Sequence, residues 1–403
     1  MMNQPLKGVK VIAFTAYGAG PGAGKILADW GADVVRIDPP KGEPGRTTGL
    51  ILGMRADEEV NPHFEMINGN TRSVSVNLKT PEGIEILERL LKDANIFISN
   101  YRLKALVKLG LDYESMSARH PHIIWGHLDG FGHLGPAADN PGFDTVAFWA
   151  RTGAMIDFSE NGEYPLTPPF GLGDLGTACS LAGGVCAALY NQMKTGKGEK
   201  VMTSLFAQNI WNEGSLIQST MYGDEFPKSR KKANSPLINS FKCKDGEWIF
   251  VSVLVYERYF GTMCKLIGRE DLIDDVRFNT LDAAKQHREE LIAIFDEAFL
   301  NHTQDEWDDI LTEADIAHDR IKHIKDVASD PQAIANSYVY EYENRNGEKS
   351  ILPSTPVKFG KIEAPVHRNA PLLGEHSKEV LKECGYADEE IQELIEKGIL
   401  ISK

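Results

Sequence analysis

The chain has 403 residues, which is long for one domain, so we expect two. Hydrophobic residues make up 42% of it and charged residues 25%, as in ordinary globular proteins. The net charge of -15 argues against nucleic acid or an anionic membrane as partner, because phosphate surfaces attract basic proteins.

Two further features bear on where the protein works. No apolar run approaches about 18 residues and no apolar segment follows the first methionines, so we expect neither a membrane span nor a signal peptide. The five cysteines are scattered, without a C-x-x-C pair or a histidine cluster at metal-ligand spacing. We therefore expect no metal site, and a reducing cytoplasm fits this cysteine usage.

The first part of the chain alternates between strand and helix patterns. Residues 9–14 predict a buried strand, the glycine-rich residues 18–24 open a helix that runs to about Trp30, and residues 32–38 predict a second strand. This βαβ unit indicates a parallel α/β sheet. The alternation continues with a helix expected at residues 81–93 and a strand at 94–99. Two short helices at 103–108 and 113–119 then lead to another strand at 122–126.

One motif in this region points to a dinucleotide. Gly18-x-Gly20-x-x-Ala23 matches the dinucleotide-binding fingerprint, and Asp38 follows where a ribose-binding acid belongs. Pro21 weakens the match, because it removes one N–H group from the loop that should hold the pyrophosphate. A dinucleotide-dependent oxidoreductase therefore stays open as an alternative.

A proline- and glycine-rich stretch, residues 169–178, leads into a long apolar helix from about Leu175 to Met193. Asp174 lies at this junction among Gly171, Gly173 and Gly176. A carboxylate there has two interpretations. It is either the N-cap of the helix or a reactive group held ionised at the helix start.

The composition changes at the basic residues 227–232, which favour a linker. Beyond it, Asp245-Gly246 predicts a hairpin between strands near residues 241–242 and 248–253. Three helices, expected at residues 256–267, 283–300 and 304–314, complete a small α+β domain. A pair of strands is expected at 338–342 and 350–352, and two helices at 376–385 and 387–397 end the chain.

Several stretches in the same order along the chain resemble the family III CoA-transferases. They are residues 5–11, 19–21, 27–34, 68–73, 77–83, 100–102, 109–111, 130–136, 141–144, 195–198 and 371–376. The resemblance implies an α/β fold with a Rossmann-like large domain at residues 1–205 and 330–403. A helical linker at residues 206–227 and a small α+β domain at residues 228–325 would complete it. Each chain would form a ring, and two rings would interlock in a homodimer.

The resemblance also implies a reaction. Asp174 falls on the catalytic aspartate of the family, whose carboxylate attacks an acyl-CoA thioester and carries the acyl group and CoA through covalent aspartyl intermediates. Acyl-CoA is then a substrate, and no permanently bound cofactor and no metal are expected. Backbone N–H groups near Gly173 and Gly176 are our candidates for holding the tetrahedral oxyanions.

Five residues are implied as contacts of CoA. Asn100 and Tyr101 occupy the position of a pair that lies near CoA in the family, and Lys108 stands where relatives carry arginine. Arg46 and Arg72 are looser matches for the phosphates. An apolar acyl site would need aromatic walls, for which the candidates are Tyr17, Phe143, Trp149 and Phe170.

A sister group, the α-methylacyl-CoA racemases, shares the fold and the aspartate. Racemases also need a histidine just before a second aspartate, and here Phe143 precedes Asp144. Phenylalanine cannot transfer a proton, so we favour a transferase over a racemase. The stretches around residues 104–108, 142–151 and 171–174 are most similar to the subgroup that places CoA on 2-hydroxy acids such as 2-hydroxyisocaproate or aryl lactates.

Overall fold

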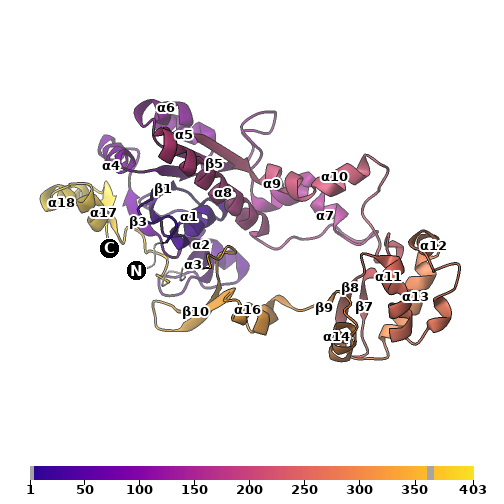
Figure 1. Ribbon diagram of the computed structural model, residues 1–403. Helices are drawn as coiled ribbons and strands as arrows, with labels where there is room; N and C mark the ends of the chain where they lie inside the picture. The colour runs from indigo at the N-terminus through magenta and orange to yellow at the C-terminus, as the bar shows by residue number, and fades with distance from the viewer. Residues whose placement is uncertain (1–3, 361–366) are drawn as a thin grey trace. The chain divides into compact units, whose positions relative to one another are not determined.

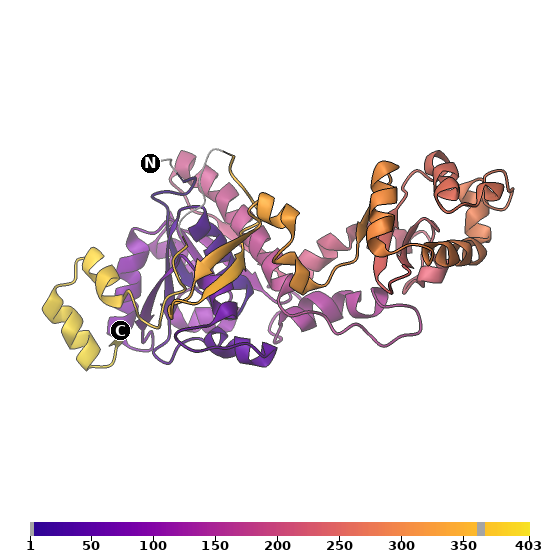
Figure 2. The same cartoon turned by 90° about the horizontal axis from the view of Figure 1, so that it is seen from below.

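The computed structural model describes residues 4–360 and 367–403 and divides into two compact units (Figures 1 and 2). The first unit takes Met1–Ala154, Pro168–Met221 and Gln332–Lys403. The second unit takes Met155–Thr167 and Tyr222–Pro331. The second unit is therefore an insertion within the sequence of the first.

A seven-stranded sheet with the order β12-β3-β2-β1-β4-β5-β6 organises the first unit. Strands β1 to β6 are parallel and β12 pairs antiparallel with β3, which confirms the predicted parallel α/β sheet. The bounds are β1 Lys10–Phe14, β2 Asp33–Asp38, β3 Arg72–Val76, β4 Ile96–Ser99, β5 Ile124–Asp129, β6 Lys200–Ser204 and β12 Leu400–Ile401. The strand order reverses between β1 and β4, and such a reversal leaves a crevice at the carboxyl ends of the two strands.

Alternation along β1 divides its side chains between two layers. Ile12 and Phe14 belong to a core shared with helices of one layer, while Ala13 faces α1 at Gly24. The first layer contains α4 Pro81–Lys92, α5 Leu103–Leu109, α6 Tyr113–Arg119, α17 Ser377–Glu383 and α18 Asp388–Glu396. The second contains α1 Ala19–Asp29 and α8 Leu172–Thr195, which pack on one another. Gly126 of β5 lets α8 approach closely, since a Cβ atom there would lie 3.0 Å from Val185.

Other elements of the chain are short. Where a helical linker is predicted at residues 206–227, the chain forms two helices divided at Glu213, α9 Leu205–Asn212 and α10 Gly214–Thr220. A π-helical segment at Asp144–Ala150 was not predicted. The remaining elements are α2 Gly45–Thr48, a 3-10 turn Gly49–Leu52, α3 Pro62–Asn68, α7 Ala154–Asp157, α16 Pro331–Ala335 and the antiparallel pair β10 Val339–Glu343 and β11 Lys349–Pro353.

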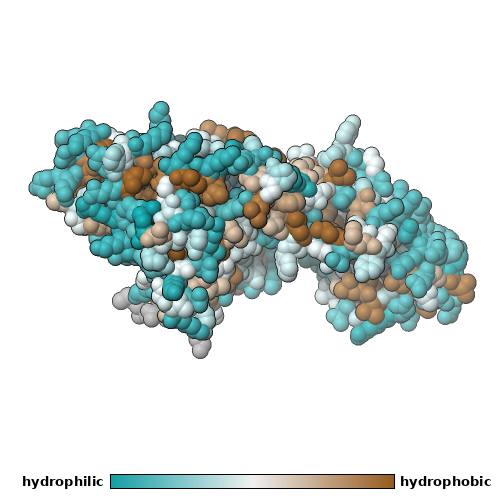
Figure 3. Space-filling view, turned by 90° about the horizontal axis from the view of Figure 1, so that it is seen from above, coloured by the Kyte–Doolittle hydropathy of each residue, from teal (hydrophilic) through white to brown (hydrophobic). Residues whose placement is uncertain are grey.

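Helix α8 is long and apolar enough to cross a membrane by length and composition alone, with a mean hydropathy of 1.4, so the prediction that no apolar stretch approaches about 18 residues is wrong. The expectation of no membrane span is not contradicted, because the core helix of a globular protein passes the same test. Half of that apolar window is buried inside the protein, against α1 and the sheet, as in the core helix of a globular domain. Apolar side chains also reach the surface, and Figure 3 shows apolar patches among the hydrophilic residues. Large exposed ones on α8 to α10 and just beyond are Tyr190, Met193, Trp211, Met221 and Tyr222.

The second unit has a three-stranded antiparallel sheet with helices packed on it. The predicted hairpin is confirmed, since β7 Ile238–Lys242 pairs with β8 Trp248–Ser252 around Gly246 at φ 90°. Strand β9 His318–Arg320 adds to β8. The helices are α11 Tyr256–Leu266, α12 Leu281–Gln286, α13 Arg288–Phe299, α14 Gln304–Glu313 and α15 Ile324–Val327, with 3-10 turns at Arg230–Lys232 and Glu270–Leu272. Phe241, Phe299 and Trp307 stack at the centre of its core.

Leu87 of α4 tests the packing of the first unit, because its side chain is fully buried in the shared core. We expect Leu87→Ala to lower the free energy of unfolding by about 3 kcal/mol, through lost burial and the cavity left behind. The matched control is Glu85→Ala on the exposed face of the same helix, for which a change below about 0.5 kcal/mol is expected. Urea unfolding followed by fluorescence measures both, and equal effects would contradict the packing described.

Candidate active site

A cavity of about 390 Å³ lies at the carboxyl ends of the parallel strands, where the strand order reverses. Its walls come from the segments after β1, β4 and β5, with Phe143 and Asp174. The chemistry-bearing or aromatic side chains among its lining residues are Tyr17, Asn100, Tyr101, Arg102, Asp129, His133, Asp139, Asn140, Phe143 and Asp174. The structure thus brings together five of the predicted site residues, Tyr17, Asn100, Tyr101, Phe143 and Asp174.

Asp174 is not the N-cap of α8. The helix begins at Leu172 with Gly171 as cap, in the left-handed conformation at φ 83°, so Asp174 stands in the first turn. The capping carboxylate comes from Asp144, which is 3% exposed and whose Oδ2 atom accepts the N–H of Gly173 at 3.2 Å. Sequence reasoning used Asp144 only as a landmark beside Phe143. No local pattern reveals a cap supplied from such a distant part of the chain.

The N–H groups of Gly173 and Gly176 are not free to hold an oxyanion as predicted. The N–H of Gly173 is already donated to Asp144, so it does not face the cavity. Gly176 lies in the second turn of α8, where N–H groups bond within the helix. The glycine at position 173 has a packing reason instead, because a Cβ atom there would lie 2.3 Å from Oδ1 of Asp144.

The start of α1 lies directly against Asp174. A Cβ atom on Gly18 would stand 2.3 Å from Oδ2 of Asp174, so any side chain at position 18 would displace the carboxylate. The first N–H groups of α1 therefore lie near this anion, with the positive end of the helix dipole. Gly20 is equally constrained, since its Cβ atom would lie 2.7 Å from the amide of Asn100.

The pKa values of the two carboxyl groups are raised together. Burial, and then the charge of Asp144, raise the pKa of Asp174 to about 7. Burial also raises the pKa of Asp144, while the N–H groups of Gly173, Gly171 and Asp174 oppose the rise. With this raised pKa, Asp174 is partly protonated near neutral pH and not held fully ionised as the sequence suggested, and its anion is more basic than that of an ordinary aspartate.

Two residues bind the loop after β1 from neighbouring elements. The side-chain amide of Asn100 accepts the N–H of Ala16 at 2.8 Å and donates to its carbonyl at 2.7 Å. Glu43 accepts the N–H of Tyr17 at 3.1 Å. Asn100, predicted as a CoA contact, is thus also a structural clamp of the loop, and Glu43 was missed because it lies far away in sequence.

The cavity has an aromatic wall. The rings of Tyr17 and Phe143 meet edge to face with centroids 5.2 Å apart, and both are substantially exposed. Tyr101 stacks on Phe14 at 4.2 Å, and burial raises the pKa of its hydroxyl to about 12. Trp149 and Phe170, the other predicted wall residues, do not line this cavity.

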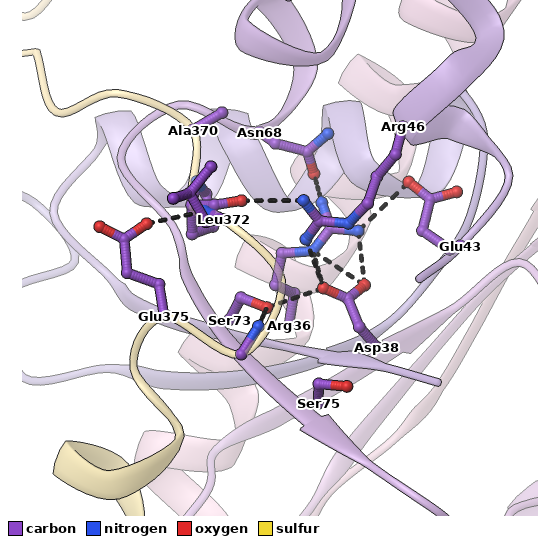
Figure 4. A network of polar contacts seen from close by, with 12 residues as sticks. Arg36, Asp38, Glu43, Arg46, Asn68, Ser73, Ser75, Ala370, Leu372 and Glu375 are labelled. Atoms are coloured by element: carbon purple, nitrogen blue, oxygen red, sulfur yellow. Dashed lines mark hydrogen bonds and ion pairs between the residues drawn. The ribbon is translucent and has the colours of Figure 1, made fainter. Parts of the chain in front are cut away.

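The predicted phosphate ligands Arg46 and Arg72 are engaged in ion pairs within the first unit. Arg46 pairs with Asp38 at 2.7 Å (Figure 4). It also donates to the carbonyl of Pro371. Arg72 binds three carboxylates, those of Asp33, Glu379 and Glu383. Lys108 is exposed on α5. Arg102, which sequence reasoning did not select, is exposed and lines the cavity.

Asp38 cannot serve as the ribose ligand of a dinucleotide site. It is fully buried and accepts from Arg36, Arg46 and Ser73. Burial would raise the pKa of its carboxyl, but the charges of Arg36 and Arg46 outweigh burial and lower that pKa to about 2. The acid in the apparent dinucleotide motif is therefore part of a buried ion network.

A histidine cluster that was not expected lies beside the cavity, which Asp129 and His133 line and from which His127 is buried. Ring nitrogens of His127 and His133 and a carboxylate oxygen of Asp129 lie within 4.8 Å of one another. His127 Nε2 lies 2.8 Å from the carbonyl of Tyr101, so it is the donor, and its Nδ1 atom accepts from His133 Nε2 at 2.8 Å. Burial lowers the pKa of His127 to about 4. A neutral hydrogen-bonded relay accounts for these contacts. The H-x-D-x-x-x-H spacing at the end of β5 was the signal available in the sequence.

Comparisons with known proteins agree on one family. The sequence model of "CoA-transferase family III" matches residues 6–377. The (R)-2-hydroxy-4-methylpentanoate CoA-transferase of Clostridioides difficile is 40% identical, over 96% of this chain and 97% of its own. The cinnamoyl-CoA:phenyllactate CoA-transferase of Clostridium sporogenes is 37% identical, over 98% and 97%.

Solved structures show the same similarity. The crystal structure of Rv3272 from M. tuberculosis superposes with a TM-score of 0.82 at 26% identity, over 93% of this chain and 98% of its own. A CAIB/BAIF family protein from Brucella suis gives a TM-score of 0.81 at 28% identity, over 95% and 100%.

The raised pKa of Asp174 predicts a pH-dependent stability. A carboxyl with a raised pKa holds its proton more tightly in the folded state, so its ionisation destabilises the fold as pH rises from about 4 to about 7. We therefore expect Asp174→Asn to be more stable than the wild type by about 2 kcal/mol at pH 8, with a smaller difference at pH 5. Urea unfolding of both proteins at the two pH values measures this. A difference that does not change with pH would contradict the raised pKa.

Proposed function

The chain belongs to CoA-transferase family III, and we propose that it moves CoA between a CoA thioester and a 2-hydroxy acid with a branched aliphatic or aromatic side chain. The observation that carries this proposal is the placement of Asp174 and the Tyr17–Phe143 pair in one cavity. A reactive carboxylate beside apolar walls suits an acyl group whose side chain is apolar. The acids in the names of the two relatives, 2-hydroxy-4-methylpentanoate and phenyllactate, have such side chains.

In the proposed reaction, a carboxylate oxygen of Asp174 attacks the thioester carbonyl of the donor. The C–S bond breaks, CoA thiolate leaves, and a mixed anhydride with Asp174 remains. The thiolate then attacks the aspartyl carbonyl and releases the donor acid, which leaves an aspartyl-CoA thioester. The acceptor carboxylate attacks the carbonyl of this thioester, the C–S bond breaks and CoA thiolate leaves, so that a mixed anhydride of Asp174 with the acceptor forms. The thiolate then attacks the acceptor carbonyl of the anhydride, which gives the acceptor CoA thioester and releases the Asp174 carboxylate.

The surroundings of Asp174 support this role. Asp144 takes the N–H of Gly173 at the start of α8, so the first turn of its own helix does not neutralise the Asp174 anion. In place of Gly173 and Gly176, we propose the start of α1 at Gly18 as the region that stabilises the tetrahedral oxyanions. Phe143 supplies no transferable proton, and this favours transfer over racemisation.

Acyl-CoA is the substrate in this proposal, and neither a metal nor a permanently bound cofactor takes part. We propose Asn100, Tyr101 and Arg102 as CoA contacts, because they line the cavity at the end of β4. Lys108 remains a further candidate for a phosphate, since it is exposed on the following helix.

The proposed assembly is a homodimer of interlocked rings in the cytoplasm. We propose that the large domain takes most of the first unit and the small domain most of the second. The bounds differ from the predicted ones, since residues 155–167 belong to the second unit and the predicted linker at 206–227 is divided between the units after Met221. The exposed apolar side chains on α8 to α10, such as Tyr190 and Trp211, support an interface with a second copy of this chain.

Asp174→Ala is expected to lower the rate of CoA transfer by about 10³-fold or more, because the covalent path is lost. Hydroxylamine added during turnover should leave a hydroxamate on the Asp174 peptide of the wild type, detected by mass spectrometry. Wild-type protein treated without acyl-CoA is the control. Full transfer by the variant, or no modification during turnover, would contradict the covalent role of Asp174.

Substitutions of two glycines, one just before α1 and one inside it, test what fixes the position of the Asp174 carboxylate. Gly18→Ala should lower kcat by about 10²-fold or more, because the new Cβ atom would displace the Asp174 carboxylate. Gly24→Ala should leave kcat within about threefold, since its Cβ atom would meet Ile98 and Val34 at ordinary contact distances of 3.6 Å. Steady-state kinetics compares them. Equal kcat values for the two variants would show that Gly18 does not set the position of the carboxylate.

A further inference from the structure

Tyr17 has an unusual backbone conformation for a bulky residue. Its φ is 62°, in the left-handed region that favours glycine. The other non-glycine residues with positive φ in the described part of the chain are Asn70, Asp315 and Ser337, which have small polar side chains. A large aromatic residue keeps this strained conformation only where its surroundings hold it, and such strain is concentrated at functional sites.

Glu43 is the group that holds Tyr17. One carboxylate oxygen, Oε2, accepts the N–H of Tyr17 at 3.1 Å and the N–H of Gly45 at 2.6 Å. Glu43 is 2% exposed, so its carboxylate is held by protein groups and not by water. The bond to Tyr17 therefore acts on the backbone of the strained residue itself.

A buried network fixes Glu43 in turn. Its Oε1 atom pairs with Arg36 at 3.2 Å, and Arg36 also pairs with Asp38 at 2.8 Å (Figure 4). Asp38 pairs with Arg46, whose guanidinium donates to the carbonyl of Pro371. Two guanidinium groups face two carboxylates, so the buried charges balance, and each has several partners.

The backbone conformation of Tyr17 determines whether its ring forms part of the cavity wall. The Tyr17 ring meets Phe143 edge to face, at 82° between the ring planes, and both rings line the cavity that holds Asp174. The next residue, Gly18, lies against the Asp174 carboxylate. If Tyr17 left the left-handed region, its ring would turn away from Phe143, and the aromatic wall would open.

We propose that Glu43 is a positioning residue that fixes Tyr17 as a wall of the acyl site and thereby sets which acyl side chains are accepted. Glu43 is not among the residues that line the cavity, so it acts through Tyr17 and not by contact with substrate. This inference rests on the proposed function and deepens it. It assigns acyl selectivity to the Glu43–Tyr17 pair.

A double-mutant cycle tests the coupling, with cinnamoyl-CoA as donor and with phenyllactate and lactate as the two acceptors. The wild type should prefer phenyllactate in kcat/KM, because lactate has no large side chain to meet the aromatic wall. Glu43→Gln should reduce this preference by about tenfold, because phenyllactate binds more weakly and its KM rises, with kcat changed by less than about threefold. Tyr17→Gly should reduce the preference similarly, and the double variant should reduce it no further.

Two results would overturn the inference. One is additive losses in the double variant, which would mean that Glu43 does not act through Tyr17. The other is an equal loss of kcat with both acids in Glu43→Gln, which a general structural defect produces. Ser337→Gly is the matched control, because Ser337 also has a left-handed backbone (φ 52°) but is exposed and lies outside the cavity lining. Its selectivity should equal that of the wild type.

Hydrogen exchange tests the positioning role without any substrate. In Glu43→Gln, the amides of residues 15–18 should exchange at least about tenfold faster than in the wild type, while those of β1 exchange at an unchanged rate. Faster exchange across the whole first unit, or no faster exchange at residues 15–18, would overturn the inference. Failure of the wild type to transfer CoA to either acid would instead refute the proposed acceptor class, and the exchange result would still decide the role of Glu43.

Discussion

The capping of α8 by the carboxylate of Asp144 is the interaction on which the candidate site depends. A helix of 24 residues has a strong positive end, and an aspartate in its first turn would ordinarily satisfy that end itself. Because Asp144 takes this role from a separate segment, Asp174 is left to face Gly18 and the cavity. The two carboxyl groups then repel one another in a partly buried place, and this repulsion, added to burial, gives Asp174 its high proton affinity.

The strand order of the sheet determines where the cavity that holds Asp174 lies. The reversal between β1 and β4 opens the sheet at one position, and the loops after these strands carry Tyr17 and Asn100 to its edges. Close packing then removes freedom from these loops. Gly20 admits the amide of Asn100, and that amide in turn holds both backbone groups of Ala16. The site is thus built on rigid elements, although most of its residues belong to loops.

Local patterns predicted most of the fold. The apolar runs of β1 and β2, the Asp245-Gly246 turn and the glycine-rich start of α1 all reflect forces between near neighbours in sequence. Family resemblance added Asp174 and the cavity residues Tyr17, Asn100, Tyr101 and Phe143. Sequence reasoning missed what depends on contacts between distant segments. The cap from Asp144, the commitment of Arg46 and Arg72 to carboxylates, and the bond from Glu43 to Tyr17 each join residues that no periodicity links.

The contribution of α17, α18 and β12 to the core has a consequence for the order of folding during synthesis. Val380, Leu381 and Leu400 pack in the same core as Ile37 and Val74, although most of the chain separates the two groups in sequence. A growing chain therefore exposes that layer of the sheet, and the unpaired edge of β3, until almost all of the first unit has left the ribosome. The second unit lies between these parts in sequence and has its own core, so it can fold while the first unit is still incomplete.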